Sequence, residues 1–311
     1  MSRPGLKVFA PASVANVAVG YDILGFAIEG PGDEIIINEG DKPGLHIKAI
    51  RGTTKELPLQ TEMNTAGYAG LQLMRHLGYE KEAVEIEIFK KMPFGSGLGS
   101  SAASAVAGAF AVNEFFGAPL TKRELLRYAV EGEQIADGAW HADNVAPSLM
   151  GGIILIRDNE TLDCIKLPVP SGLYSCVVYP HISILTKESR AILSETVSLQ
   201  NHIRQTGNMG YFVAGLYRTD LDLLRRSLED VIIEPQRAQL IPHFYEMKEA
   251  ALSEGALGFS ISGAGPSVFS LCQNSLIAEQ IGVRINKILS DHRIKNDVFI
   301  SKINTEGAFK F

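Results

Sequence analysis

The sequence has few cysteines and little net charge. Its three cysteines, Cys164, Cys176 and Cys272, lie far apart in apolar stretches, form no CxxC motif and have no histidine at metal-ligand spacing, so we expect each to pack in the core. Lysine and arginine number 29 against 35 aspartate and glutamate residues, a net charge of −6 with the two signs interspersed. This balance argues against nucleic acid as the main partner. A site for an anionic substrate must therefore use a few local cations and backbone amides.

Long hydrophobic runs are also missing. No uninterrupted apolar stretch is long enough to span a bilayer, and Asn16 and Asp22 interrupt the first segment before a run resembling a signal sequence is complete. With 46% apolar residues over 311 positions, the chain can bury the core of one large domain or two ordinary ones. We expect a folded enzyme of the reducing cytoplasm that contacts no membrane.

Alternating apolar residues predict strands, and helices fall between them. The expected strands cover residues 34–38, 45–50, 84–89, 152–157, 174–179, 258–262 and 267–272, and the expected helices cover residues 64–77, 100–116, 121–137, 199–230, 241–254 and 276–289. Thr121 and Glu124 fit a capping box. Residues 166–172 (KLPVPSG) hold two prolines and a glycine and mark the expected boundary between two domains, residues 1–167 and 168–311. The element order predicts an α+β protein with hairpins.

The clearest local signal is a glycine-serine loop between a predicted strand and an alanine-rich helix. The loop reads Pro93, Phe94, Gly95, Ser96, Gly97, Leu98, Gly99, Ser100 and Ser101. Its glycines let the backbone curl with the N–H groups inward, and the following helix adds unpaired amides and the positive end of its dipole. Such a loop is suited to phosphate binding, and its serine hydroxyls can reach phosphate or a metal ion. The alternative is a flexible turn before a buried helix.

Two other nucleotide-binding motifs are weighed against this loop. A Walker P-loop is excluded, because no GxxxxGK[ST] string occurs. Gly97, Gly99 and Ala102 fit the loose GxGxx[G/A] form of a dinucleotide fingerprint, which makes an oxidoreductase the competing interpretation. That fingerprint requires a second strand carrying an acidic residue about 20 residues onward, whereas this sequence passes through residues 117–120 into another helix.

Three strings together resemble the GHMP kinases, the family of galactokinase, homoserine kinase, mevalonate kinase and phosphomevalonate kinase. They are APASVANVAVGYDILG at residues 10–25, the loop ending in GLGSSAAS at residues 97–104, and SGAGPS at residues 262–267. They occur in family order and span nearly the whole chain. The resemblance implies a two-domain fold, with an N-terminal ribosomal protein S5 domain 2-like α/β domain and a C-terminal ferredoxin-like α+β domain. It also implies ATP as phosphoryl donor, Mg²⁺ as cofactor and a homodimer.

Other strings are similar to the members of the family that phosphorylate homoserine. These are HADNVAP at residues 141–147 followed by Gly151-Gly152, then Thr186, Arg190 and EPQR at residues 234–237. One departure is Val17-Ala18-Val19, where the family more often shows Leu-Gly-Pro, and we expect it to alter turn stiffness more than chemistry. The resemblance implies ATP-dependent phosphorylation of the L-homoserine hydroxyl in threonine biosynthesis. The alternatives are another GHMP kinase, such as a mevalonate-type kinase, and a nucleotide-binding protein without kinase activity.

Free homoserine carries an ammonium, a carboxylate and a hydroxyl, and the sequence offers a partner for each. Asp22, with Asn16 on the same loop, can hold the ammonium, and Arg190 and Arg237 can hold the carboxylate in bidentate geometry. The remaining predicted substrate-binding residues are His141, Asn144 and Thr186. Mevalonate lacks the ammonium and would leave a carboxylate such as Asp22 unpaired, at a cost on the order of 1–3 kcal/mol.

Each of these residues also has an ordinary structural explanation. Asp22 and Asn16 can be ordinary turn residues, and Arg190 and Arg237 can be surface arginines near Glu188 and Glu234. His141 can be a packed histidine beside Trp140. Asn144 can be a helix cap, and Thr186 can begin a helix over residues 187–193.

The resemblance also assigns the metal and the closing loop. Glu133 and a loop serine, Ser100 or Ser101, are expected to coordinate Mg²⁺, with an exposed helix acid as the alternative for Glu133. Gly263 and Gly265 are expected to close the ATP site from the second domain, with a plain glycine hairpin as the alternative.

The use of a catalytic base stays open in the sequence. Asp143 lies in a string like the one that carries the catalytic aspartate of mevalonate-type relatives, but the homoserine-phosphorylating members are generally read as lacking that base. We expect direct attack by the hydroxyl, with Asn144 aligning it and Asp143 supporting the loop.

Overall fold

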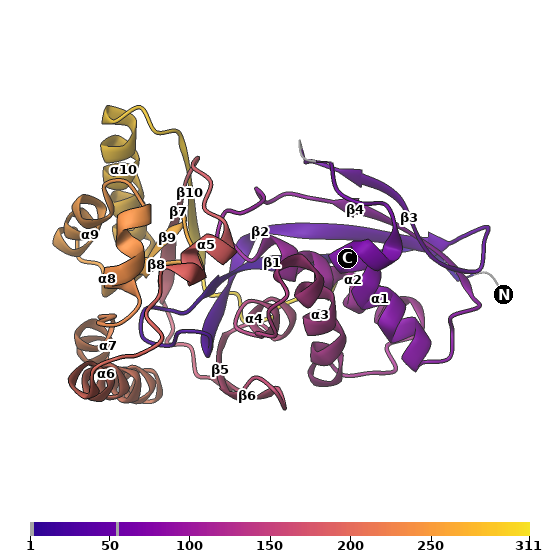
Figure 1. Cartoon of the computed structure of the whole chain (residues 1–311), viewed down its shortest axis with the longest axis horizontal. Helices are drawn as coiled ribbons and strands as arrows, with labels where there is room; N and C mark the ends of the chain where they lie inside the picture. Colours follow the sequence, from indigo (N-terminus) through magenta and orange to yellow (C-terminus); the bar gives the residue numbers. More distant parts are fainter. Residues whose placement is uncertain (1–2, 54–55) are drawn as a thin grey trace.

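Two separate β-sheets organise the chain, one built mainly from its first half and one from its second (Figure 1). The structure is a computed structural model that describes residues 3–53 and 56–311. The strands of the first sheet are β1 Leu6–Ala15, β2 Leu24–Glu39, β3 Gly44–Arg51, β4 Ala83–Phe89, β5 Ile153–Asp158, β6 Asp163–Leu167 and β11 Phe309–Lys310. Their order is β11-β1-β2-β4-β3, with β5 paired to β2 and β6 to β5. Strands β3 and β4 pair in parallel, whereas β1 and β2 pair antiparallel.

Helices of the first half pack together beside this sheet (Figure 1). They are α1 Thr65–His76, α2 Ser100–Phe115, α3 Lys122–Asp137 and α4 Val145–Met150, with the short 3₁₀ helix η1 Thr61–Met63 before α1. The predicted alanine-rich helix is confirmed as α2, and it is buried along nearly its whole length against β1 and β2. Gly108 lies so close to α1 that a Cβ there would be 2.1 Å from the Ala66 carbonyl oxygen. Small side chains therefore let α1 and α2 approach closely and fix where α2 begins.

The second sheet carries its helices at the opposite end of the molecule (Figure 1). Its strands are β7 Tyr174–Pro180, β8 Gly258–Ile261, β9 Val268–Cys272 and β10 Asn296–Lys302, in the order β10-β7-β9-β8. Its helices are α5 Thr186–Ala191, α6 Leu199–Arg218, α7 Leu221–Ser227, α8 Glu234–Arg237, η2 Ala238–Leu240, α9 Phe244–Ser253 and α10 Ser275–Asp291. Helices α9 and α10 pack against the sheet. The predicted hairpin around residues 262–267 is confirmed as the connection between β8 and β9.

The predicted helices of the first half are confirmed, including the capping box. The Thr121 side chain accepts from the Glu124 backbone N–H while the Glu124 side chain accepts from the Thr121 backbone N–H. The long helical stretch predicted over residues 199–230 is confirmed in part, because it divides into two helices, α6 and α7. Thr219 takes a left-handed backbone with φ of 55°, and Asp220 caps a separate helix, α7. The chain therefore turns a corner that hydrophobic periodicity did not reveal.

Several strands are longer than predicted or were missed. Strand β2 has 16 residues where only residues 34–38 were expected, and β1, β6, β10 and β11 were not predicted. Strand β1 reads LKVFAPASVA, whose alanine, proline and serine have low strand propensity, so its place comes from pairing with β2.

The cysteine prediction is confirmed for two of the three residues. Cys176 and Cys272 are buried in the second core, whereas Cys164 is only half-buried and contacts the guanidinium of Arg123. Cys164 packs only partly against the core of the first sheet, because β6 lies at the margin of that sheet. None of the helices within the described ranges is long and apolar enough to cross a membrane.

The division into residues 1–167 and 168–311 stays a prediction. It falls between β6 and β7, the last strand of the first block and the first of the second sheet. The chain crosses back at its end, because β11 pairs with β1 and Ile303 bridges to Ile28. The polypeptide therefore connects the two sheets twice, once between β6 and β7 and once between β10 and β11.

Candidate active site

A cavity of about 490 Å³ opens where three loops meet: the turn after β1, the glycine-serine loop before α2, and the loop between β8 and β9. Its lining includes nearly all of the predicted ATP-, metal- and substrate-binding residues. These are Asn16, Asp22, Phe94, Gly95, Ser96, Gly97, Gly99, Ser100, Ser101, Glu133, His141, Asp143, Asn144, Thr186, Arg190, Arg237, Gly263 and Gly265. Pro93 and Leu98 are not among the described lining residues, and Leu98 is fully buried in the first core.

The glycine-serine loop and the β8–β9 loop are in direct contact. The Ser262 hydroxyl donates to the Gly97 carbonyl at 2.6 Å, and the Ser267 backbone N–H donates to the Ser96 carbonyl at 3.1 Å. Gly97 has a φ of 78°, and a Cβ there would lie 2.6 Å from the Ser262 carbonyl oxygen. Only glycine fits this position, and the β8–β9 loop is more than a plain hairpin because it closes one wall of the cavity.

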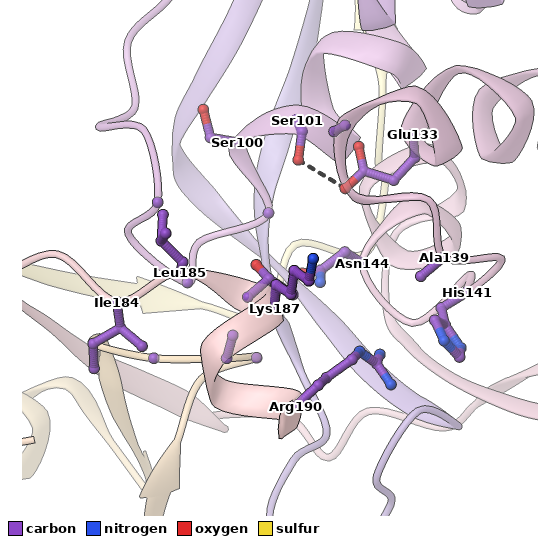
Figure 2. Close-up of a pocket in the computed structure, with 18 of the residues that line it drawn as sticks. Ser100, Ser101, Glu133, Ala139, His141, Asn144, Ile184, Leu185, Lys187 and Arg190 are labelled. Atoms are coloured by element: carbon purple, nitrogen blue, oxygen red, sulfur yellow. Dashed lines mark hydrogen bonds between the residues drawn. The ribbon is translucent and has the colours of Figure 1, made fainter. Parts of the chain in front are cut away.

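The start of α2 supplies polar groups to the cavity. Gly99 caps this 16-residue helix in a left-handed conformation and contributes no side-chain hydrogen bond, so the first-turn amides are left for another acceptor. The Ser101 hydroxyl donates to Glu133 Oε1 at 2.7 Å (Figure 2). The Ser100 hydroxyl is buried and finds no hydrogen-bond partner in the part of the chain that the structure describes. The Glu133 carboxylate of α3 and the serine hydroxyls at the start of α2 are oxygen ligands of the kind that Mg²⁺ prefers.

An ion pair that the sequence analysis missed lies buried beneath this loop. The Lys90 ammonium contacts the Asp33 carboxylate and also donates to the Ser100 carbonyl and the Ser104 hydroxyl, both at 2.8 Å. Ser104 in turn donates to Asp33 at 2.7 Å. Lys90 is 6% exposed and Asp33 is not exposed. The network ties the first turn of α2 to β2 and so fixes the helix start that faces the cavity.

Asp22 and Arg190 form a two-bond ion pair on the opposite wall. Arg190 Nη1 donates to Asp22 Oδ2 at 3.0 Å, and Nη2 donates to Oδ1 at 2.8 Å. The alternative of a surface arginine paired with Glu188 is therefore wrong. Tyr21, which the sequence analysis did not select, accepts from Arg190 Nη1 at 3.0 Å and lies under both guanidiniums. Burial, and next the Asp22 charge, raise the pKa of Tyr21, so its phenol stays protonated.

Arg237 is also held inside the protein. It is 3% exposed, and its guanidinium donates to the carbonyls of Ser189 and Gly263 and to the Tyr21 hydroxyl. Its suggested surface partner, Glu234, instead contacts Lys248 and accepts from the Ser260 hydroxyl at 2.7 Å. Two cations thus converge on one tyrosine at the substrate end of the cavity.

The turn after β1 is strained and braced. Asn16, Val17 and Ala18 have φ values of 70°, 43° and 60°, in the region that side chains disfavour. Ala18 stands where the family more often has glycine, so a residue with a Cβ adopts here a conformation that glycine takes easily. Asn16 uses its amide to donate to the Gly263 carbonyl at 2.8 Å and to accept from the Asp22 N–H at 3.0 Å. Asn16 therefore fixes the turn that presents Asp22.

Three further predicted residues face the same space. His141 Nδ1 lies 3.8 Å from Asp22 Oδ2. Asn144 stands at the start of α4, makes no capping hydrogen bond and lines the cavity, and its Oδ1 accepts from the buried Ser13 hydroxyl at 2.9 Å. Thr186 is the first residue of α5, after the capping position at Leu185, and also lines the cavity. A Cβ on Gly99 would lie 2.8 Å from Asn144 Oδ1, so the loop and Asn144 are close neighbours.

Asp143 is a buried carboxylate of the cavity whose titration is strongly shifted. Burial, and next the negative charge of Asp22, raise the pKa of Asp143 to about 7, against a lowering contribution from Arg190. Its carbonyl is packed so tightly on β2 that a Cβ on Gly25 would lie 1.8 Å from the oxygen. The 141–147 loop is thereby held rigidly against the sheet.

Lys187 is another residue that the sequence analysis missed. It lies one position after Thr186 and three before Arg190, and its side chain points into the cavity (Figure 2). Within the described ranges it has no ion-pair partner, in contrast to Arg190. The ordinary appearance of a lysine in a polar helix gives no signal in the sequence.

Comparison with known proteins supports one family along nearly the whole chain. Residues 64–152 match the GHMP kinases N terminal domain, and residues 212–291 match the GHMP kinases C terminal domain. The chain is 43% identical to the homoserine kinase of Chlorobium phaeovibrioides, covering 97% of this chain and 98% of that protein. It is 40% identical to the homoserine kinase of Xylella fastidiosa, covering 97% and 92%.

Solved structures agree with the sequence relatives. The crystal structure of homoserine kinase from Cytophaga hutchinsonii matches with a TM-score of 0.96 and 46% identity, covering 99% of this chain and 97% of that one. The L. major mevalonate kinase in complex with R-mevalonate matches with a TM-score of 0.72 and 18% identity, covering 97% and 99%. The second likeness shows the shared fold alone.

Proposed function

Because this chain belongs to the GHMP kinase family, we infer that it transfers the γ-phosphoryl group of ATP to the side-chain hydroxyl of L-homoserine, giving O-phospho-L-homoserine for threonine biosynthesis. The relatives that cover almost the full chain are homoserine kinases. The observation in the site that carries the inference is the Asp22–Arg190 pair in the cavity wall. It offers one group for an ammonium and one for a carboxylate, the two ends of a free amino acid.

Substrate recognition follows from that pair. The ammonium of homoserine binds Asp22, and its carboxylate binds Arg190 and Arg237 with charge-assisted hydrogen bonds. Tyr21 keeps the two guanidiniums at a fixed separation by accepting from both. His141 and Thr186 complete the wall around the substrate, while Asn16 holds the turn.

ATP binds along the glycine-serine loop. The backbone amides of residues 95–101 hold the phosphates at the start of α2, and Gly263 and Gly265 close over them from the β8–β9 loop. Lys187 supplies a mobile positive charge on the open side, where the transferred group carries developing negative charge. The loop contacts at Gly97 keep both walls at the spacing that phosphates require.

Magnesium fits the start of α2. Glu133 and a loop serine, Ser100 or Ser101, would hold it. All three line the cavity with oxygen donors, the Ser101 hydroxyl lies 2.7 Å from Glu133 Oε1, and the Ser100 hydroxyl has no hydrogen-bond partner among the described residues. When bound, the ion neutralises charge on the β- and γ-phosphates.

The reaction needs positioning more than proton abstraction. Asn144 aligns the homoserine hydroxyl with the γ-phosphorus, the new P–O bond forms as the bond to ADP breaks, and the hydroxyl proton passes to a phosphoryl oxygen. Asp143 supports the 141–147 loop. Its raised pKa reflects burial beside Asp22, which disfavours its charged form.

A mevalonate-type kinase is the alternative within the family. Mevalonate has a carboxylate and a hydroxyl but no ammonium, so it could occupy Arg190 only by leaving Asp22 without its partner. An unpaired carboxylate there costs on the order of 1–3 kcal/mol, which favours the amino acid.

The test is ADP release by the purified protein with Mg-ATP and L-homoserine, mevalonate, galactose or no acceptor. We expect turnover that depends on homoserine and collapses in Arg190→Ala. Turnover with mevalonate instead would retain the fold and the ATP loop but reject the substrate, and equal ADP release without acceptor would reject the kinase reaction.

The assembly and the compartment are part of the same proposal. We propose a cytoplasmic homodimer, and the three unpaired thiols agree with a reducing compartment. Sedimentation of the purified protein at two concentrations tests the dimer.

A further inference from the structure

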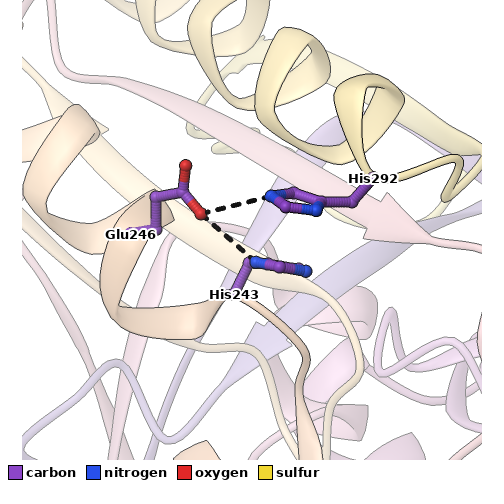
Figure 3. Close-up of side chains that lie close together, drawn as sticks. All are labelled: His243, Glu246 and His292. Atoms are coloured by element: carbon purple, nitrogen blue, oxygen red, sulfur yellow. Dashed lines mark hydrogen bonds and ion pairs between the residues drawn. The ribbon is translucent and has the colours of Figure 1, made fainter.

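Three potential metal ligands lie together in the second half of the chain, on helices that pack against the second sheet and outside the cavity. His243 precedes α9, Glu246 lies in its first turn, and His292 ends α10 (Figure 3). Both histidines direct a ring nitrogen at the same carboxylate oxygen: His243 Nδ1 is 3.2 Å and His292 Nε2 is 3.7 Å from Glu246 Oε2. The three ligand atoms lie within 4.8 Å of one another. They come from two helices that are far apart in sequence but packed together.

We propose that His243, Glu246 and His292 bind one divalent ion of the zinc class, which clamps the start of α9 to the end of α10. Two imidazole nitrogens and one carboxylate oxygen form a mixed donor set that suits Zn²⁺ and its neighbours, whereas Mg²⁺ prefers oxygen ligands. The site is therefore chemically distinct from the one at Glu133. The remaining coordination positions face solvent and take water.

Two of the three donor separations, those to Glu246, are close to those of a metal site. With metal–ligand bonds of about 2.0–2.1 Å in a tetrahedron, neighbouring donors lie about 3.3 Å apart. The 3.2 Å separation between His243 and Glu246 already matches, and the 3.7 Å separation to His292 needs only a small closing movement.

The imidazole rings must turn when the ion binds. They are now stacked, with centroids 3.5 Å apart and an interplanar angle of 16°. Two imidazoles on one tetrahedral ion place their centroids about 5 Å apart, because the ion lies in the plane of each ring. The side chains of His243 and His292 are 30% and 44% exposed, which leaves room for rotation. A metal ion binds the neutral form of the imidazole ring.

The backbone beneath the cluster is fixed. Phe244, next to His243, is 2% exposed, and Leu289, three residues before His292, is fully buried. The His243 carbonyl accepts from the Met247 N–H at 2.9 Å, and the His292 N–H donates to the Ile288 carbonyl at 3.3 Å. His292 also stands at the C-terminal end of α10, where the helix dipole favours a cation. Binding therefore requires side-chain rotation alone.

The first experiment is calorimetric titration of metal-free, untagged protein with ZnCl₂ in excess Mg²⁺. We expect one zinc site per chain that persists in Glu133→Ala, and a rise in Tm on adding zinc. His292→Ala and Glu246→Gln should each weaken zinc binding by about 10-fold or more, since each removes one ligand. His181→Ala is the matched control, because His181 is another exposed histidine paired with a carboxylate, Asp297, at 2.9 Å.

Two results would overturn the proposal. One is unchanged zinc affinity in both His292→Ala and Glu246→Gln; the other is loss of binding in Glu133→Ala, which would place the ion in the nucleotide site. X-ray absorption at the zinc edge checks the ligands directly and should show two imidazoles with only nitrogen and oxygen donors. Neither readout depends on phosphoryl transfer, so failure here leaves the proposed kinase reaction untouched.

Discussion

Arg190 holds Asp22 through two hydrogen bonds, Nη1 to Oδ2 at 3.0 Å and Nη2 to Oδ1 at 2.8 Å. The pair satisfies both charges while no substrate is bound. A zwitterionic amino acid carries an ammonium and a carboxylate close together, so it can bind between Asp22 and Arg190 and give each residue a new partner. A carboxylate without an ammonium cannot make that exchange. We therefore expect the pair to discriminate between ligands by their charge pattern.

Replacing one partner should damage homoserine binding selectively. In Asp22→Asn the ammonium loses its counter-charge and Arg190 loses its partner, and we expect KM for homoserine to rise about 30- to 1000-fold, equivalent to about 2–4 kcal/mol. KM for ATP should stay within about twofold. Steady-state kinetics on Asp22→Asn, Arg190→Gln and the double variant test whether the two residues are coupled. If they are, the KM of the double variant for homoserine should rise by much less than the product of the two single increases. Fully multiplicative losses would show that the two residues act independently.

The Tyr21 hydroxyl should set the affinity for the substrate carboxylate without affecting chemistry. Tyr21→Phe keeps the ring under both guanidiniums but removes the oxygen that accepts from Arg190 and Arg237. Two buried N–H groups then lack a partner, at about 1–3 kcal/mol, so KM for homoserine should rise about 5- to 100-fold. The kcat should change little. The exposed Tyr245→Phe is the control, and a fall in kcat with unchanged KM would contradict this role.

Lys187 should act on the transferred phosphoryl group. Lys187→Met removes a cavity cation that has no ion-pair partner within residues 3–53 and 56–311, and we expect kcat to fall about 10-fold or more, with KM for homoserine nearly unchanged. Lys187→Arg should restore most of the activity, because the charge is kept. Measured affinities for ATP should weaken more than those for ADP. Equal weakening of both nucleotides would exclude a contact with the γ-phosphate.

The buried Lys90–Asp33 pair should dominate the stability of the glycine-serine loop. Lys90→Met leaves the Asp33 charge buried and uncompensated and releases the Ser100 carbonyl, so the free energy of unfolding should fall by about 3–5 kcal/mol. Lys48→Met, which breaks the exposed pair with Glu85, should cost about 1 kcal/mol or less. Urea unfolding measures both. Adding Asp33→Asn to Lys90→Met should recover part of the loss; a further loss would show that the charge was not the cause.

The glycine-serine loop and its neighbours were predictable because their chemistry is local. Gly97 and Gly99 must be glycines for reasons of backbone geometry that the string itself displays. The partners of the arginines were not predictable, because sequence neighbours suggested Glu188 for Arg190 whereas Asp22 lies 168 positions away. Only the packing of the two units against each other brings that pair together.

Lys90 shows a signal that was present but not used. Val84, Ile86 and Ile88 of β4 point inward, and the same alternation carried two residues further places Lys90 on the buried face. A lysine at an inward position demands a buried acceptor, and Asp33 has the same parity as the inward Ile35 and Ile37 of β2. The corner at Thr219 had no comparable signal, because a non-glycine residue with positive φ is set by its surroundings.

Ionisation of Asp143 should lower the free energy of unfolding as the pH rises, and replacing this residue should remove that pH dependence. Its pKa is raised from the model-compound value of 3.8 to about 7, mainly by burial and next by Asp22. Between these values the folded protein keeps a proton that the unfolded chain has lost. The neutral carboxyl therefore makes its full contribution to the free energy of unfolding below pH 3.8, and this contribution is lost as the pH rises through 7.

Asp143→Asn is neutral at every pH and lacks this dependence. Its free energy of unfolding relative to the unaltered protein should rise between pH 5 and pH 8 by about 1–4 kcal/mol. Urea titrations at the two pH values measure this difference, in which the other carboxylates cancel because they are common to both proteins. Parallel pH dependence of the two proteins would show that Asp143 is not protonated in the fold. The same variant decides its catalytic role: kcat should fall less than about 10-fold if Asp143 only supports the loop, whereas a loss of about 10²–10⁴-fold without loss of homoserine affinity would make it the base.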